Sequence, residues 1–258
     1  MDFQLKDKVF IVGGAGDGFG KAVTIALAEE GANILAVSRT KNKLEKLKQR
    51  FPEQIDFISG DITTEEVQEK IVRYVMKSSV SGVFVNAGGP PAGGYEDVTM
   101  EQWDDAWKSV VRWKIMFMNK LLPLMRKQKY GRVVFLESVS VKQPVDQLVL
   151  SNALRPAVVG FAKTIAREVA SDGITVNVLA PGYHSTAAME RLFKKKSEIE
   201  DVSVQEAKKQ FEAEIPVGEM GRPEEMSGIA LWLLSPLSRY VTGQTITHDG
   251  GIVRGIFG

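Results

Sequence analysis

The sequence contains no cysteine, and its only histidines are two isolated residues, His184 and His248. The absence of cysteine excludes disulfides, thiolate catalysis and Cys-ligated metal, and two isolated histidines cannot make a His-rich metal site. We therefore expect no metal centre. The chemistry has to come from a bound cofactor or from oxygen and nitrogen side chains.

The chain also lacks an excess of charge and any long apolar run. Its 33 Lys and Arg residues against 32 Asp and Glu residues leave a formal net charge of +1. Such a balance gives no field to gather polyanions, so it argues against nucleic acid and favours a small-molecule partner. No stretch approaches the ~18 apolar residues that cross a bilayer, and residues 1–7 contain no apolar signal core. We expect a cytoplasmic protein with no membrane partner.

What is present is an alternation of short strand-like and longer helix-like segments within 258 residues, of which 44% are hydrophobic. The alternation predicts an α/β fold: a single Rossmann-type domain over residues 1–258, with a doubly wound parallel sheet of about seven strands flanked by helices on both faces. No internal repeat is visible. The expected strands are 9–12, 33–37, 56–58, 82–85, 132–136, 175–179 and 244–247.

Capping residues and stop signals mark the helices between these strands. The expected helices are 22–30 ending at Gly31, 41–50 stopped by Pro52, 65–77 capped by Thr63 with Glu66 at the capping-box position, 100–127, and 151–170.

Residues 187–215 interrupt the alternation with a charged helical insertion, which we interpret as a substrate cap. The insertion contains Lys194, Lys195 and Lys196. A solvated helix face is the favoured interpretation of this lysine run, and a contact to a substrate phosphate or carboxylate is the alternative.

A glycine-rich turn, Gly13–Gly20, joins the first strand to the first helix. Such a turn lets backbone N–H groups approach a pyrophosphate at a helix N-terminus, although an isolated glycine loop can also be only a tight turn. The spacing Gly14-x-x-x-Gly18-x-Gly20 resembles the fingerprint of the short-chain dehydrogenase/reductase family, in which Thr usually stands at the position of Gly13. The sequence resembles in particular the 3-oxoacyl-carrier-protein reductase-like branch of that family.

The resemblance continues in order along nearly the whole chain, through 61–62, 86–88, 181–182, 215–216, 221–225 and 242–251. It implies that Asp61 and Ile62 contact the adenine and that the Thr186 hydroxyl meets the nicotinamide carboxamide. The residues that it assigns to the cofactor are Gly14, Gly16, Asp17, Gly18, Phe19, Ser38, Arg39, Asp61, Ile62, Asn86, Ala87, Gly88, Arg155, Pro181, Gly182 and Thr186.

The choice between the two nicotinamide cofactors depends on the end of the second strand. A carboxylate there accepts a hydrogen bond from the ribose 2′-OH and repels a 2′-phosphate, but this chain has Ser38 followed by Arg39. Arg39 can make a charge-assisted contact to phosphate, which favours NADP(H) over NAD(H). The acidic Asp17 in the glycine turn favours NAD(H) instead.

The catalytic positions depart from the family, whose site combines Asn, Ser, Tyr and Lys. The spacing Ser138-x12-Ser151-x3-Arg155 matches the Ser, Tyr and Lys positions, and the Asn position falls at Val110. Only Ser138 is retained. An aliphatic hydroxyl is a far weaker acid than Tyr, with its reference pKa of ~10, so Ser151 cannot inherit the proton transfer. The permanently charged Arg155 can instead stabilise an oxyanion. The alternative interpretation is that Ser151 caps a helix and Arg155 makes a surface ion pair.

Three other side chains near the same strand ends are candidates for acid–base work. His184 has the best intrinsic pKa, and Tyr183 stands beside it. Glu137 is either an activator of Ser138 or a buried partner of Arg155.

These patterns together predict an oxidoreductase that transfers hydride between NADP(H) and a carbonyl or alcohol substrate, such as a 3-oxoacyl group, by a non-standard proton path. One alternative is a nucleotide-binding pseudoenzyme with a sensing or assembly role, and another is a structural oligomer without cofactor. The apolar stripes of 100–127 and 151–170 predict a homodimer or homotetramer, because the family pairs these helices across a two-fold axis.

Overall fold

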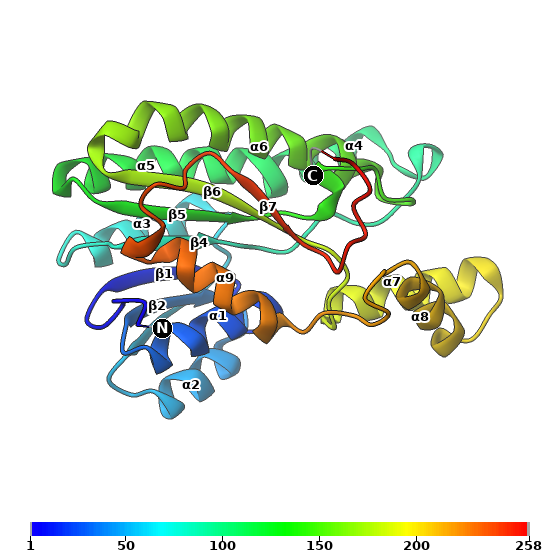
Figure 1. Ribbon diagram of the computed structural model, residues 1–258, viewed down its shortest axis with the longest axis horizontal. Helices are drawn as coiled ribbons and strands as arrows, with labels where there is room; N and C mark the ends of the chain where they lie inside the picture. Colours follow the sequence, from blue (N-terminus) through cyan, green and yellow to red (C-terminus); the bar gives the residue numbers. More distant parts are fainter. Residues whose placement is uncertain (1, 257–258) are drawn as a thin grey trace.

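Seven parallel strands form one central sheet in the protein, which a computed structural model describes over residues 2–256 (Figure 1). The strands are β1 (Val9–Gly13), β2 (Asn33–Ser38), β3 (Ile55–Ser59), β4 (Gly82–Val85), β5 (Gly131–Leu136), β6 (Ile174–Pro181) and β7 (Thr245–His248). Their order is β3-β2-β1-β4-β5-β6-β7, and every neighbouring pair is parallel. The predicted fold class is confirmed, with strand ends displaced by one or two residues.

Helices cover both faces of this sheet (Figure 1). They are α1 (Gly18–Glu29), α2 (Lys41–Arg50), α3 (Glu65–Val75), α4 (Met100–Ala106), α5 (Trp113–Gln128), α6 (Val149–Val169), α7 (Ala187–Glu200), α8 (Val204–Ala213) and α9 (Pro223–Leu234). One core cluster joins the sheet to α3, α5 and α6, and a second joins its other face to α1, α2 and α9. All residues of β5 and β6 are buried, as expected for strands covered on both sides.

The strand order reverses between β1 and β4. The connections that leave the carboxyl ends of these two strands therefore run to opposite faces of the sheet, and a crevice opens between them. Ligands of doubly wound sheets bind in this crevice. The residues that follow β1, β2, β4, β5 and β6 all meet at this edge, so the fold brings the predicted site segments together.

Three local predictions are corrected by the structure. The N-cap of α3 is Thr64, whose hydroxyl accepts from the Val67 N–H, because Thr63 instead donates its N–H and hydroxyl to Asp61. The helix predicted over 100–127 is divided by a π-helical turn at Trp107–Arg112. The helix predicted from Ser151 begins at Val149, with Leu148 at its N-cap, so Ser151 is not a helix cap.

The insertion at 187–215 forms two helices, α7 and α8, separated by a break at which Asp201 adopts a left-handed conformation. The pair lies beyond one end of the sheet, beside the carboxyl ends of the strands (Figure 1). A small apolar cluster of its own, with Tyr183, Phe193 and Met220 among its members, anchors it to the segments that follow β6. Within residues 2–256, every helix is too short or too polar to cross a membrane.

Candidate functional site

The glycine turn after β1 has a backbone conformation that exposes N–H groups at the start of α1. Gly14 and Gly18 have φ of +63° and +48°, in the left-handed region that favours glycine. A Cβ on Gly20 would lie 2.3 Å from the Gly14 carbonyl oxygen, so the start of α1 packs directly on the turn. Among residues 2–256, and apart from the chain neighbours and helix backbone of Gly18 itself, the atoms within 4 Å of a Cβ at Gly18 belong to Thr186, the nearest at 3.5 Å. The glycines thus stand where backbone N–H groups at the N-terminus of α1 can approach a pyrophosphate.

The segment after β4 forms the other wall of the crevice. The Asn86 side-chain amide donates to the Gly13 carbonyl oxygen at 3.2 Å. A Cβ at position 13 would lie 2.3 Å from the Asn86 carbonyl oxygen, which explains why the Thr usual in the family is replaced by glycine here. Ala87 is half-buried and Gly88 is exposed beyond it. The predicted residues of both walls are thus in direct contact.

The end of β2 carries the predicted determinants of the 2′ position. The Ser38 hydroxyl lies 2.7 Å from where a Cβ on Gly16 would be, and Arg39 is exposed beside it. Asp17 caps α1 and forms an ion pair with Lys43 at 2.5 Å. The sequence interpretation counted Asp17 against NADP(H) and did not consider Lys43. The signal was available, because Lys43 lies in the first turn of the helix that follows Arg39.

The predicted adenine contacts lie after β3. Asp61 is half-buried, and its Oδ1 accepts from the Thr63 N–H and hydroxyl at 3.0 and 2.8 Å. Ile62 is 4% exposed, and its methyl terminus lies 3.1 Å from where a Cβ on Gly13 would be. Both residues therefore line the same side of the crevice as the glycine turn.

The segment after β6 approaches the glycine turn from the opposite side. Pro181 ends the strand, and the Gly182 N–H donates to the His248 carbonyl oxygen at 3.0 Å. Thr186 is the N-cap of α7, yet its hydroxyl makes no capping hydrogen bond. The Thr186 methyl carbon is the atom nearest to where a Cβ on Gly18 would be, at 3.5 Å. A glycine turn at a helix N-terminus, with a threonine opposite it whose hydroxyl makes no capping hydrogen bond, fits a dinucleotide.

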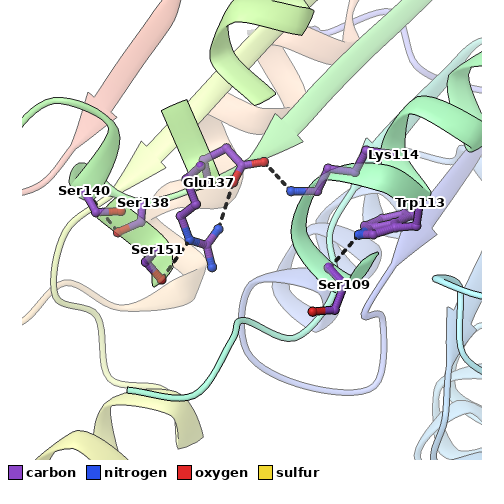
Figure 2. A network of polar contacts seen from close by, with 8 residues as sticks. Ser109, Trp113, Lys114, Glu137, Ser138, Ser140 and Ser151 are labelled. Atoms are coloured by element: carbon purple, nitrogen blue, oxygen red, sulfur yellow. Dashed lines mark hydrogen bonds and ion pairs between the residues drawn. The ribbon is translucent and has the colours of Figure 1, made fainter. Parts of the chain in front are cut away.

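A buried trio of charges lies at the end of β5 (Figure 2). Glu137 has a side chain with no exposed surface, and its two oxygens accept from two cations. Lys114 Nζ, on α5, donates to Oε1, and Arg155 Nη1, on α6, donates to Oε2 at 2.9 Å. Arg155 is therefore not a surface residue with a solvated ion pair. The second interpretation of Glu137, a buried partner of Arg155, matches the observed contact.

The two serines of the predicted catalytic set lie next to this trio (Figure 2). The Arg155 Nε is 3.5 Å from the Ser151 hydroxyl oxygen, one helical turn away on the same face of α6. Ser138 is half-buried, and its hydroxyl accepts from the Ser140 N–H at 3.2 Å. The turn after Ser138 packs against α6. Ser138, Ser151 and Arg155 thus share one neighbourhood, as their spacing predicts.

Lys114 was missed by the sequence interpretation. It lies one helical turn after Val110, the position of the family's Asn, at the start of the helix that follows the π-turn. Burial lowers the pKa of Lys114, and the Glu137 carboxylate opposes that shift. The signal was its register: Val110, Lys114 and Phe117 fall on one apolar helix stripe, where a lysine needs a buried partner.

Tyr183 and His184 are not hydrogen-bonded to the trio or to the two catalytic serines. The Tyr183 hydroxyl donates to Glu214 at 3.0 Å, and burial raises its pKa. His184 is 2% exposed, packs edge-on against Phe19, and shares a 2.9 Å hydrogen bond with His248. The two histidines are therefore a contacting pair and not isolated residues as the sequence suggested. Burial lowers the pKa of His184.

A pocket of 380 Å³ lies between α7, α8 and the loop that precedes α6. Lys195 and Lys196 line it, which departs from the favoured interpretation of the lysine run as a solvated face. Lys195 donates to the Ala92 carbonyl oxygen at 2.8 Å, and Lys196 pairs with Glu200 at 2.9 Å. Lys194 alone of the three is exposed.

Comparison with known proteins connects this geometry to characterised enzymes. A sequence profile of the family described as enoyl-(acyl carrier protein) reductase matches residues 14–253. A 3-oxoacyl-[acyl-carrier-protein] reductase of Thermotoga maritima is 31% identical over 258 aligned positions, covering 97% of this chain and 99% of the relative.

Solved structures show the same arrangement of elements. The L-sorbose reductase of Gluconobacter frateurii, determined with NADPH and L-sorbose, is 26% identical with a TM-score of 0.91, over 99% of this chain and 100% of that one. A variant of the actinorhodin polyketide ketoreductase with NADPH is 27% identical with a TM-score of 0.91, over 96% of this chain and 98% of that one.

Proposed function

Since the chain belongs to the short-chain dehydrogenase/reductase family and is an oxidoreductase of carbonyl and alcohol groups, we propose that it reduces a carbonyl with NADP(H) while Arg155 and Ser138 hold the substrate oxygen. The observation that carries the proposal is the position of Arg155. Glu137 fixes one side of its guanidinium, and Ser151 lies against its Nε. A cation held in this way beside Ser138 is preorganised to stabilise an oxyanion.

The preference for NADP(H) over NAD(H) is supported by the charges around Ser38. Arg39 is exposed there, and Lys43 neutralises Asp17, the one acidic residue of the glycine turn. A 2′-phosphate would meet the Arg39 cation and no uncompensated carboxylate. Both reductase structures named above were determined with NADPH.

The bound nicotinamide supplies or accepts the hydride, and this chain's residues act on the substrate oxygen. Arg155 stabilises the negative charge that develops on that oxygen, and the Ser138 hydroxyl donates a hydrogen bond to it. Because Arg155 is permanently charged, it releases no proton, and the oxygen takes its proton from water.

Neither remaining candidate donor suits the role of general acid. Burial lowers the pKa of His184, so at neutral pH it carries no extra proton to give. Burial and the Glu214 carboxylate raise the pKa of Tyr183, which makes it a weaker acid than an ordinary Tyr. These directions favour a non-standard proton path through solvent.

The pocket under α7 and α8 is the proposed substrate site, with the 187–215 segment as its cap. Its lining combines apolar side chains such as Leu192 and Phe211 with Lys195 and Asp146. A 3-oxoacyl group attached to a carrier is the substrate class that the Thermotoga relative suggests. We also propose a homodimer or homotetramer in the cytoplasm, in which the apolar stripes of α5 and α6 pair.

The test of this proposal is cofactor binding followed by a substrate screen. Calorimetry with NADPH and NADH gives the affinities, and loss of NADPH absorbance with 3-oxoacyl thioesters and simple ketones gives turnover. Arg155→Met and Ser138→Ala are expected to lower turnover about 10²-fold or more. Ser140→Ala is the matched control, because the buried Ser140 hydroxyl has no hydrogen-bond partner among residues 2–256.

Each outcome discriminates between the candidate functions. Binding of NADPH without turnover of any carbonyl would support the nucleotide-binding protein with a sensing or assembly role. Equal loss of turnover in Ser138→Ala and Ser140→Ala would remove Ser138 from the site. Absence of binding of both cofactors would overturn the proposal.

A further inference from the structure

The buried trio at the end of β5 carries a net charge that one residue determines. The side chains of Lys114, Glu137 and Arg155 are 4%, 0% and 14% exposed. Glu137 and Arg155 alone would form a neutral pair. Lys114 adds a second cation to the same carboxylate, so the trio retains one positive charge. Little water screens this charge, because the groups lie below the protein surface.

The trio faces the part of the crevice opposite the adenosine determinants. Arg155 Nη2 lies 2.9 Å from where a Cβ on Gly89 would be, directly after the wall formed by residues 86–88. Ser38 and Arg39 lie at the end of β2, on the other side of the switch point between β1 and β4. Under the proposed function, the adenosine end occupies that side and the nicotinamide end lies near the trio.

The two redox states of the cofactor differ in charge at the nicotinamide ring. The oxidised ring is a cation and the reduced ring is neutral, so a fixed positive charge nearby raises the free energy of the oxidised form only. We propose that Lys114, acting through Glu137 and Arg155, keeps one positive charge beside the nicotinamide subsite and thereby makes the protein bind NADPH more tightly than NADP⁺. This inference rests on the proposed function and makes Lys114 a positioning residue for carbonyl reduction.

The competing explanation is that the trio only fixes the packing of α5 and α6 on β5. Buried ion pairs commonly contribute little net stability, and removal of one partner is costly whatever the pair does. A structural role therefore changes the stability of the variants. It does not change the ratio of the two cofactor affinities in a direction set by charge.

The test measures the dissociation constants of NADPH and NADP⁺ for the intact protein and three variants. Lys114→Met makes the trio neutral, Glu137→Gln gives it two positive charges, and the double variant restores one. A unit charge at ~10 Å in an effective dielectric of ~20 changes a dissociation constant about tenfold. The ratio of the NADP⁺ constant to the NADPH constant should fall about tenfold in Lys114→Met and rise about tenfold in Glu137→Gln. The double variant should return to within about twofold of the unmodified protein.

Lys120→Met is the matched control. Lys120 lies on the same helix and also pairs with carboxylates, Glu65 and Glu69, but at the surface beside α3. Its replacement changes the protein's total charge by the same unit and should leave the ratio unchanged. Thermal unfolding of every variant separates loss of fold from loss of charge.

A second readout needs no substitution. Lys114 faces Glu137 from β5, Arg155 from α6 and the Trp113 ring from its own helix. Burial lowers the pKa of Lys114, and loss of its proton makes the trio neutral, so the affinity ratio should fall as pH rises toward the ordinary lysine pKa. If Glu137→Gln fails to fold, Lys114→Met, the double variant and this pH series still carry the test.

A ratio in Lys114→Met within twofold of the unmodified protein, or a double variant that stays like Lys114→Met, would overturn the inference while leaving the proposed reaction intact. Absence of binding of both redox forms by the unmodified protein would instead overturn the proposed function. The two failures are therefore distinguishable by cofactor titration alone.

Discussion

Lys43 Nζ lies 2.5 Å from Asp17 Oδ2, which joins the first turn of α2 to the N-cap of α1. The hydrogen bond from Lys43 lowers the pKa of Asp17, so the carboxylate stays ionised and paired at neutral pH. An acidic residue in the glycine turn would ordinarily repel a 2′-phosphate. Because Lys43 compensates the charge of Asp17, Arg39 is the exposed cation that the proposed phosphate site relies on.

We predict that Lys43→Met lowers the affinity for NADPH about fivefold while changing the affinity for NADH less than twofold. The physical reason is that an unpaired Asp17 then faces the 2′-phosphate, which only NADPH carries. Calorimetric titration of both cofactors measures the effect. Ser38→Asp should shift the preference in the same direction.

Lys48→Met is the control for this change, because Lys48 also lies on α2 and pairs with an aspartate, Asp56, at 3.1 Å. Its replacement should leave both affinities unchanged. Equal responses of the Lys43 and Lys48 variants would show that the 2′ position is not read at Asp17.

The glycines of the turn give a prediction about stability as well as binding. Gly20→Ala places a Cβ 2.3 Å from the Gly14 carbonyl oxygen, and this overpacking is expected to cost about 1–3 kcal/mol of unfolding free energy and to abolish tight cofactor binding. Gly160→Ala, on α6, meets no atom within 4 Å and should instead stabilise by up to about 1 kcal/mol. Urea unfolding and NADPH titration of both variants check the pair. A stable Gly20→Ala protein with normal binding would contradict this role of the glycine turn.

The glycine turn, the doubly wound parallel sheet and the convergence of site segments were predictable because each depends on local patterns. Apolar runs between amphipathic segments specify a doubly wound sheet, and its topology brings the strand ends to one edge. Positions such as Gly14 and Thr186 therefore fell where expected. The Thr63 cap was wrong by one residue because two threonines compete there and Asp61 binds the first.

Contacts between distant segments were not predictable in the same way. Lys114 and Glu137 are 23 residues apart, and although the place of Lys114 on an apolar stripe shows that it needs a buried partner, nothing local identifies that partner as Glu137. His184 and His248 are 64 apart and meet only because β6 pairs with β7. The partner of a charged or titratable group depends on tertiary packing, which a single sequence does not specify.

The His184–His248 pair predicts acid sensitivity. Burial lowers the pKa of His184 below its usual value, so the unfolded chain binds a proton more readily than the folded one between that lowered pKa and ~6.5. Stability is therefore full above pH ~6.5 and is lost as pH falls through the folded pKa. His248, Glu225, Asp249 and the Gly182 carbonyl are the groups that act on His184.

The midpoint temperature of thermal unfolding should fall as pH is lowered from 7.5 to 5. In His184→Gln this decrease should be smaller. Carboxylates with a lowered pKa, such as Asp17 and Asp56, are protonated only at lower pH. Their effect on stability therefore does not overlap with that of His184 between pH 7.5 and 5. An identical slope in the variant would show that His184 does not titrate here.

The last prediction concerns the two positions at which the chain departs from its family. Ser151→Tyr with Arg155→Lys restores the family's residues, but the surrounding structure is built for the present pair. Ser151 is 6% exposed, so a Tyr ring would have to displace its neighbours. A Lys at position 155 keeps the charge but not the planar fork that donates to Glu137 while lying against position 151.

We expect the double variant to turn over the protein's own substrate at least tenfold more slowly than the unmodified protein, with its affinity for NADPH within about threefold. Val110→Asn added to the pair should not recover it, because the buried Lys114–Glu137 ion pair one turn beyond position 110 stays in place. Steady-state kinetics on a substrate identified by the screen measures this, with Arg155→Lys alone as the control. A gain of carbonyl reductase activity in the double variant, from near zero, would show that Arg155 and Ser138 form no working site in the unmodified protein and would favour a protein that only binds the nucleotide.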